Sequence, residues 1–217
     1  MPRRRRYGMG GFVFHVLNRG ARRGVLFDTP DDYDAFVRLL RRAVEERPIR
    51  LLGFCAMRTH FHLLVWPEND EQLPRFMHWL TATHALRWRD ATDTIGEGAV
   101  YQGRYKAIPV QTDEHFLRVA RYVERNPLRA RLVERAEDWR WSSLWHREVA
   151  RDGFPFAEWP VDRPADWIEH VNQPQTMGEL LAIRRCVIRG CAVGNASWQK
   201  EVAKNLGIPG YFRPSGR

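Results

Sequence analysis

Residues 49–66, with the sequence IRLLGFCAMRTHFHLLVW, form two apolar runs, Ile49–Met57 and Thr59–Trp66, that only Arg58 separates. Apolar runs of this length are typical of buried strands. A break this short predicts a tight antiparallel hairpin or, as the alternative, one long bent strand. In both cases the stretch is extended, and the other elements can be placed around it.

The flanking segments alternate between strand and helix patterns. Phe12–Leu17 and Val100–Val110 are predicted strands. Helices are predicted at residues 29–47, 72–89 and 112–125. Thr29 begins the first helix and Pro48 ends it, whereas Thr112 begins the third and Pro127 ends or kinks it. The resulting order β-α-β-β-α-β-α predicts an α+β fold, a ferredoxin-like (split βαβ) antiparallel sheet with helices on one side.

The composition of the chain changes near residue 150. Residues 152–174 contain four prolines and predict an irregular connection. Thr176–Glu179 is a capping box that opens a helix ending near Arg189, and Ser197 is expected to cap another that ends at Gly207. We therefore expect a domain at residues 1–150 that carries the function. A linker and a small, basic, helical C-terminal extension follow at residues 151–217.

Composition and charge narrow the class of protein. The 217 residues include 35 Lys and Arg against 26 Asp and Glu, a formal net charge of +9, which predicts a polyanionic partner, most often nucleic acid. No apolar run approaches the roughly 20 residues of a membrane span, so no membrane partner is expected. Secretion is not expected either, because the stretch Phe12–Leu17 is too short for a signal peptide. Three cysteines without metal spacing fit a reduced, cytoplasmic protein.

The sharpest local feature is the pair His60 and His62. Residues two apart on a strand share a face, so both imidazoles point one way while Phe61 and its apolar neighbours point into the core. Two imidazoles so placed can fill two positions on one divalent metal. Two unrelated histidines on a half-exposed strand would give the same pattern. The other histidines have no comparable partner and are expected to be packed or on the surface: His15, His78, His84, His115, His146 and His170.

A second candidate group lies on the third predicted helix. Tyr122 and Asn126 are four residues apart and therefore share a helix face. The tyrosine could act as a nucleophile while the amide oxygen helps to hold a metal. The alternative is an ordinary half-buried aromatic residue and an ordinary helix stop or kink before Pro127, with Glu124 and Arg125 exposed to solvent.

Basic residues supply candidate phosphate contacts. Gln102, Arg104 and Lys106 alternate along their predicted strand and are expected on one face. The other candidates are Arg121 on the tyrosine helix, loop residues Arg19, Arg22 and Arg23, and an N-terminal basic arm at Arg3–Arg6. For any single arginine, a solvated surface position is an equal alternative. If these residues do bind nucleic acid, affinity should fall steeply with salt.

Four ordered blocks resemble the single-tyrosine HUH transposases, and within them the REP-associated tyrosine transposases. They are MRTHFHLL at 57–64, YQGRYK at 101–106, RYVERNPLRA at 121–130 and WRWSS at 139–143. The resemblance covers about residues 10–150 well and the tail more loosely. One departure is that Arg58-Thr59 stands where that family usually has Pro-Asn.

The resemblance implies a specific chemistry. A Mg²⁺ or Mn²⁺ ion would be held by His60, His62 and Asn126, and Tyr122 would attack a DNA phosphodiester. The expected products are a covalent 5′-phosphotyrosine and a free 3′-OH, with rejoining that needs no ATP. The expected partner is single-stranded or hairpin DNA, and the expected assembly is a monomer or a homodimer.

Two other functions compete with this one. A ferredoxin-like sheet with a basic face could be a non-catalytic nucleic-acid-binding module, which has no need of His60, His62, Asn126 and Tyr122. A metal nuclease that uses water would leave no protein–DNA adduct. Covalent attachment to DNA is therefore expected only of the transposase-type enzyme.

Overall fold

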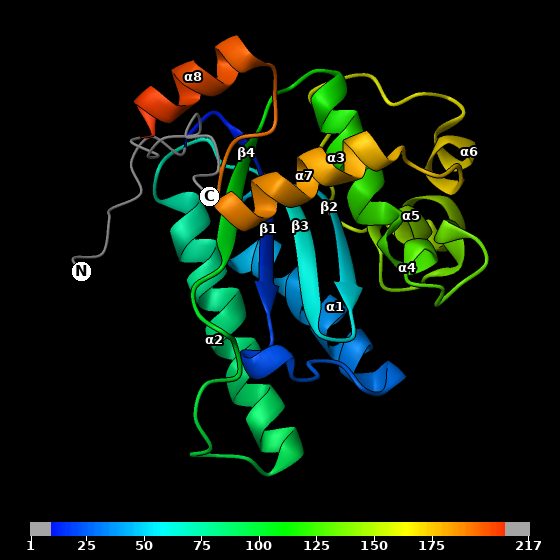
Figure 1. Cartoon of the computed structure of the whole chain (residues 1–217). Helices are drawn as coiled ribbons and strands as arrows, with labels where there is room; N and C mark the ends of the chain where they lie inside the picture. The colour runs from blue at the N-terminus through cyan, green and yellow to red at the C-terminus, as the bar shows by residue number, and fades with distance from the viewer. Residues whose placement is uncertain (1–9, 207–217) are drawn as a thin grey trace.

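The computed structural model describes residues 10–206 and contains a four-stranded antiparallel sheet in the order β2-β3-β1-β4 (Figure 1). Its strands are β1 Val13–Arg19, β2 Arg50–Met57, β3 His60–Trp66 and β4 Lys106–Val110. Helix α1, Pro30–Glu46, connects β1 to β2, and helix α2, Gln72–Thr92, connects β3 to β4. This strand order and these two crossovers confirm the predicted ferredoxin-like α+β fold.

Residues 49–66 form a tight hairpin. Met57 of β2 faces His60 of β3, so only Arg58 and Thr59 lie between the paired residues. The bent-strand alternative is therefore wrong. Thr29 caps α1 as predicted: its hydroxyl accepts from the Asp32 backbone N–H, and the Asp32 carboxylate accepts from the Thr29 backbone N–H.

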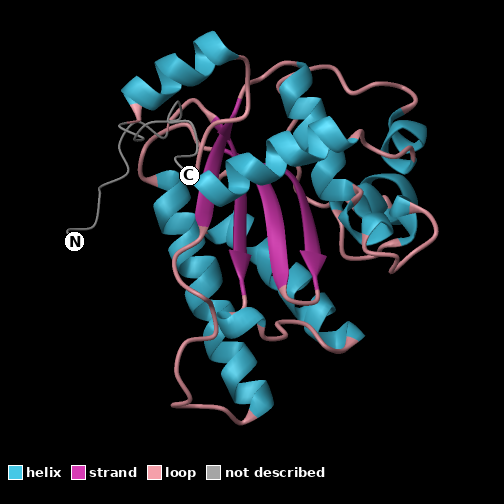
Figure 2. Cartoon of the chain, viewed as in Figure 1, coloured by secondary structure: helices cyan, strands magenta, loops and turns pink. Residues whose placement is uncertain are grey.

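The two faces of the sheet are covered by different helices. Phe61 points to the face covered by α1, where its ring centroid lies 5.0 Å from that of Phe36. His62 points to the other face, where Tyr122 of α3 packs edge-on against it. The prediction of helices on one side is thus correct for α1 and α2, whereas α3 and α7 lie on the opposite face (Figures 1 and 2). The reason is that the strands are apolar on both faces, so both faces need a cover.

Several boundaries differ from the predicted ones. β4 begins only at Lys106, because the chain turns at Gln102–Arg104 before it. Asp113, and not Thr112, caps α3. Asn195, and not Ser197, caps α8. Six α-helices follow β4 in the described part of the chain: α3 Glu114–Glu124, α4 Asn126–Arg129, α5 Ser143–Trp145, α6 Trp167–Asn172, α7 Met177–Arg189 and α8 Ala196–Asn205. The predicted arm at residues 3–6 and the predicted helix end at Gly207 lie outside the described residues.

The C-terminal segment packs on the sheet and shares its core. Trp167 of α6 is buried, and its ring centroid lies 5.0 Å from that of Trp159. Val193 exchanges backbone hydrogen bonds with β4, donating to the Pro109 carbonyl at 2.8 Å and accepting from the Gln111 N–H at 2.8 Å. Between residues 10 and 206, no helix has both the length and the apolarity needed to cross a membrane.

A buried histidine makes stability depend on pH. His84 of α2 accepts or donates a 2.6 Å hydrogen bond with the Tyr101 hydroxyl, and burial lowers its pKa from 6.5 to about 4. Below pH 6.5 the unfolded chain gains a proton that the folded chain does not, so stability is full above pH 6.5 and falls as pH drops toward 4. The difference in pKa corresponds to about 3 kcal/mol.

His84→Gln removes this titration and keeps an acceptor for Tyr101. In urea unfolding at pH 7 and pH 4.5, we expect the variant to lose less stability than the wild type by up to about 3 kcal/mol. Equal losses in both proteins would show that His84 does not contribute to the acid sensitivity.

Candidate active site

Strands β1 and β3 and helix α3 bring the predicted site residues together. The rings of His60 and His62 lie 4.9 Å apart between centroids and meet edge-on. The Tyr122 ring lies 6.0 Å from that of His62, also edge-on. Tyr122 is almost fully buried on α3, and His62 is almost fully buried on β3. The predicted pair and the predicted tyrosine are therefore neighbours in space, although about sixty residues separate them in the sequence.

A third histidine, His15, completes the cluster. Its Nε2 lies 2.8 Å from His62 Nδ1, and its ring stands edge-on to Tyr122 with centroids 6.1 Å apart. The expectation that His15 lacks a partner is wrong. Its apolar setting in Phe12–Leu17 correctly indicated a buried position, but the pairing of β1 with β3 is what places it beside His62.

All three imidazoles are neutral near neutral pH. Burial, reinforced by the charge of His60, lowers the pKa of His15 to about 3. Burial lowers the pKa of His60 to about 4, with Arg19 and Arg129 adding to the effect. Burial also brings the pKa of His62 well below 6.5. A neutral imidazole offers the lone pair that a metal needs.

The donor set fits a divalent metal on one structural ground. His62 Nε2 is buried and has no hydrogen-bond partner among the described residues, whereas its Nδ1 is bonded to His15. A ring with one nitrogen bonded to a neighbour and the other free is the usual state of a ligating histidine. His60, His62 and the Asn126 amide oxygen are the residues that would hold the ion.

Arg129 links the tyrosine to Asn126. The chain does not stop at Asn126 but kinks into the short helix α4, so that Arg129 returns over the site. Its guanidinium lies 4.3 Å from the centroid of the Tyr122 ring and donates at 2.6 Å to Asn126 Oδ1. Sequence reasoning missed this residue. Its spacing of three from Asn126 was the available signal, since residues three apart share a helix face.

The other arginines of the tyrosine helix hold the chain together. Arg121 donates to the Gln173 carbonyl at 2.7 Å and to the Pro174 carbonyl at 3.2 Å. Arg125 donates to the carbonyls of Val171 and Asn172, at the end of α6. Arg121, a predicted DNA contact, is buried in this arrangement. Arg129, which is not among the predicted DNA contacts, is the arginine that lies over the tyrosine ring.

Glu124 is a buried carboxylate rather than a solvated one. Ser143 donates to its Oε1 at 2.6 Å, and Trp167 donates to its Oε2 at 2.7 Å. Burial raises its pKa even though both hydrogen bonds act in the opposite direction. Glu124 thus links α3 to α5 and α6, and the WRWSS block at residues 139–143 contributes Ser143 to this link.

Basic residues gather where β1 ends and β3 begins. Arg19 pairs with His60 across the two strands, and Arg22 and Arg23 follow as exposed residues in a 3-10 turn, Ala21–Arg23. The Gln102 N–H donates at 2.9 Å to the Arg19 carbonyl, which brings exposed Arg104 to the same end of the sheet. We call Arg19, Arg22, Arg23 and Arg104 the basic edge.

Lys106 contacts helix α7 instead of the basic edge. Its ammonium donates at 2.8 Å to the Val187 carbonyl of α7. The expectation that Gln102, Arg104 and Lys106 alternate on one strand face is wrong, because only Lys106 belongs to β4. The backbone hydrogen bond from Gln102 to Arg19 ends the regular alternation.

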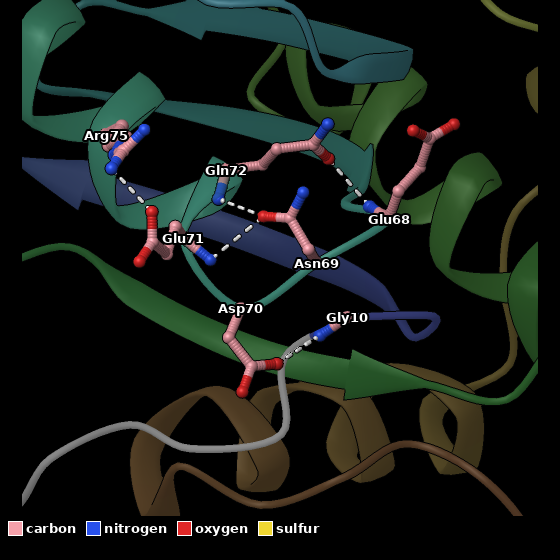
Figure 3. Close-up of a pocket in the computed structure, with 7 residues that line it drawn as sticks. All are labelled: Gly10, Glu68, Asn69, Asp70, Glu71, Gln72 and Arg75. Atoms are coloured by element: carbon pink, nitrogen blue, oxygen red, sulfur yellow. Dashed lines mark hydrogen bonds and ion pairs between the residues drawn. The ribbon is translucent and has the colours of Figure 1, made fainter.

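Two other polar groups lie away from the histidines. Figure 3 shows a hollow at the start of α2, near the end of β3 opposite to His60, where Asn69 Oδ1 accepts from the N–H groups of Glu71 and Gln72 at 3.1 Å each. These hydrogen bonds stabilise the first turn of α2. Asp113, Glu114 and His115 form a second group at the start of α3, with side-chain ligand atoms that lie within 4.8 Å of one another.

Comparison with known proteins gives three matches of different reach. The family described as "Transposase IS200 like" matches residues 11–126. A protein of Haemophilus influenzae (strain Rd), assigned as a REP-associated tyrosine transposase, is 25% identical over 165 residues, which cover 70% of this chain and 89% of that protein. A solved REP-associated tyrosine transposase bound to a REP hairpin matches with a TM-score of 0.53 and 23% identity over 76% of this chain and 96% of that one. The last match shows a shared fold.

Proposed function

The chain belongs to the IS200-like transposase family, and we propose that it cleaves and rejoins single-stranded DNA at hairpin-flanked repeats in the cytoplasm. The observation that carries this proposal is the position of Tyr122, which packs against His62 and lies under Arg129, the residue bonded to Asn126. Tyr122 thus lies beside one of the two proposed histidine ligands, and Arg129 connects its ring to the third proposed ligand, Asn126.

The proposed reaction is a transesterification. The Tyr122 oxygen attacks the scissile phosphorus, the bond from phosphorus to the 3′ oxygen breaks, and the proton lost by the tyrosine is balanced by one gained at the 3′ oxygen. The products are a 5′-phosphotyrosine and a free 3′-OH, and attack by a 3′-OH on the phosphotyrosine reverses the step. Mg²⁺ or Mn²⁺ held by His60, His62 and Asn126 would polarise the phosphate and stabilise its developing charge.

The basic side chains are placed to hold the DNA backbone. Arg19 pairs with His60 across β1 and β3, and the charges of Arg19 and Arg129 lower the pKa of His60, which supports a role for both in binding a phosphate beside that histidine. Arg22, Arg23 and Arg104 extend the positive surface along the basic edge. Hairpin DNA is the proposed partner, supported by the related structure that holds a REP hairpin.

The competing functions explain less of the site. A binding module has no need for a buried tyrosine that packs against an imidazole whose buried Nε2 has no partner among the described residues. A nuclease that uses water has no need for an arginine stacked on the tyrosine ring.

We expect an SDS-resistant adduct with a hairpin that carries a single-stranded flank, and none with the fully paired duplex of the same sequence. Cleavage without any adduct would favour the water-dependent nuclease.

The basic edge is expected to set the salt dependence of binding. In the double variant Arg22→Ala/Arg23→Ala, loss of two phosphate contacts should weaken hairpin DNA binding about tenfold and reduce the slope of log K against log salt by about 1.4. Fluorescence anisotropy at NaCl concentrations from about 50 to about 300 mM measures both the affinity and the salt slope.

The matched control is Arg42→Ala/Arg47→Ala, which removes two arginines at the other end of α1. Its affinity and salt slope should equal those of the wild type. If the two double variants behave alike, the basic edge has no special role in holding DNA.

A further inference from the structure

We propose that His15 is a positioning residue for the metal site: through its hydrogen bond to His62 Nδ1 it selects the tautomer of His62 whose Nε2 is free to ligate. This inference rests on the proposed function above. It concerns a residue on the central strand that neither the motifs nor the family resemblance assigns to the site.

His15 and His62 contact each other through one ring nitrogen each. His15 and His62 stand on neighbouring strands, with Leu17 opposite His62 and Leu64 opposite His15, so both rings rise from the same face of the sheet. Their rings are nearly parallel, at 27° with centroids 5.0 Å apart, and Nε2 of one lies 2.8 Å from Nδ1 of the other. Both side chains are buried, so water does not compete for this bond.

Only one of two proton arrangements allows a metal to bind. If His62 Nδ1–H donates to His15 Nε2, the lone pair of His62 Nε2 is free. If His15 Nε2–H donates to His62 Nδ1, the proton of neutral His62 sits on Nε2 and blocks ligation. Because a ligating histidine depends on a partner for its other nitrogen, the acceptor at His15 determines how well His62 can serve.

The orphaned atoms agree with a role beyond packing. His15 Nδ1 and His62 Nε2 are both buried without a hydrogen-bond partner among the described residues. Buried polar atoms are rarely left unsatisfied in folded proteins, and such exceptions call for a reason. A leucine at position 15 would fill the same apolar space without that cost. Retention of an imidazole there is explained by its bond to His62.

The test compares metal affinity in variants that keep or remove the acceptor. His15→Leu should weaken Mn²⁺ binding about 10- to 100-fold, the range seen when the outer partner of a ligating histidine is lost. His15→Gln, whose amide oxygen can accept, should recover most of that loss. Electron paramagnetic resonance of free Mn²⁺ measures both, with circular dichroism to confirm folding. His84→Gln, a buried histidine away from the site, is the control.

A second measurement needs no variant. Nitrogen-15 NMR of the histidine rings in the wild type should show His62 protonated at Nδ1 in the presence of Mg²⁺. Equal Mn²⁺ affinity in His15→Leu and wild type overturns the role of His15 and leaves the proposed function standing. Protonation of His62 at Nε2 in the presence of Mg²⁺ overturns both the role of His15 and the proposed ligation by His62. If the wild type binds no Mn²⁺ at all, both proposals fail.

Discussion

Replacing Tyr122 by phenylalanine is expected to reduce covalent attachment to single-stranded DNA at least about 1,000-fold, because the variant lacks the only oxygen proposed to attack the phosphate. The ring itself remains. It keeps its edge-on contacts with His15 and His62 and its place under Arg129. Binding of uncleaved hairpin DNA should therefore stay within about twofold of the wild type.

The matched control for this variant is Tyr105→Phe. Tyr105 is half-buried and lies just before β4, on a different segment of the chain from Tyr122 and the three clustered histidines. Gel analysis after SDS treatment should show a normal adduct for Tyr105→Phe and none for Tyr122→Phe. An adduct in Tyr122→Phe at the wild-type rate would remove this tyrosine from the reaction.

Replacing His60 by alanine is expected to reduce adduct formation about 1,000-fold, because one of the proposed metal ligands is lost. His60 begins β3 beside the basic edge, and its neutral imidazole shares a 3.2 Å hydrogen bond with the Thr59 hydroxyl. The same loss should follow treatment of the wild type with EDTA and should be reversed by excess Mg²⁺ or Mn²⁺.

His78→Ala is the control for the ligand variant. His78 is exposed on α2 and is not near the site. Its adduct rate, Mn²⁺ affinity and EDTA sensitivity should match those of the wild type. An adduct that forms equally well in His60→Ala and in EDTA would show that no metal held by this histidine takes part.

Features that depend on short-range periodicity were predictable from the sequence. His60 and His62 share a face because side chains alternate along a strand, and Phe61 between them packs on α1 as that alternation requires. The capping boxes at Thr29 and Thr176 mark the starts of α1 and α7 for the same reason, since both depend on residues three apart.

Features that depend on strand pairing and on the later helices were not predictable in this way. His15 reaches His62 only because β1 pairs with β3 in one register, which no local pattern specifies. Arg104 leaves its predicted strand because the Gln102 backbone bonds to Arg19 from a distant part of the chain. Glu124 looks solvated until α5 and α6 fold over it.

In the proposed reaction, Tyr122 becomes covalently linked to a DNA 5′ phosphate. The most direct test incubates the wild type and Mg²⁺ with a single-stranded hairpin oligonucleotide that cannot rejoin after cleavage, digests the adduct and maps the modified peptide by mass spectrometry. We expect a peptide in which a nucleotide is linked through its 5′ phosphate to Tyr122. A modified peptide that lacks Tyr122, or cleaved DNA with no modified peptide, would contradict it.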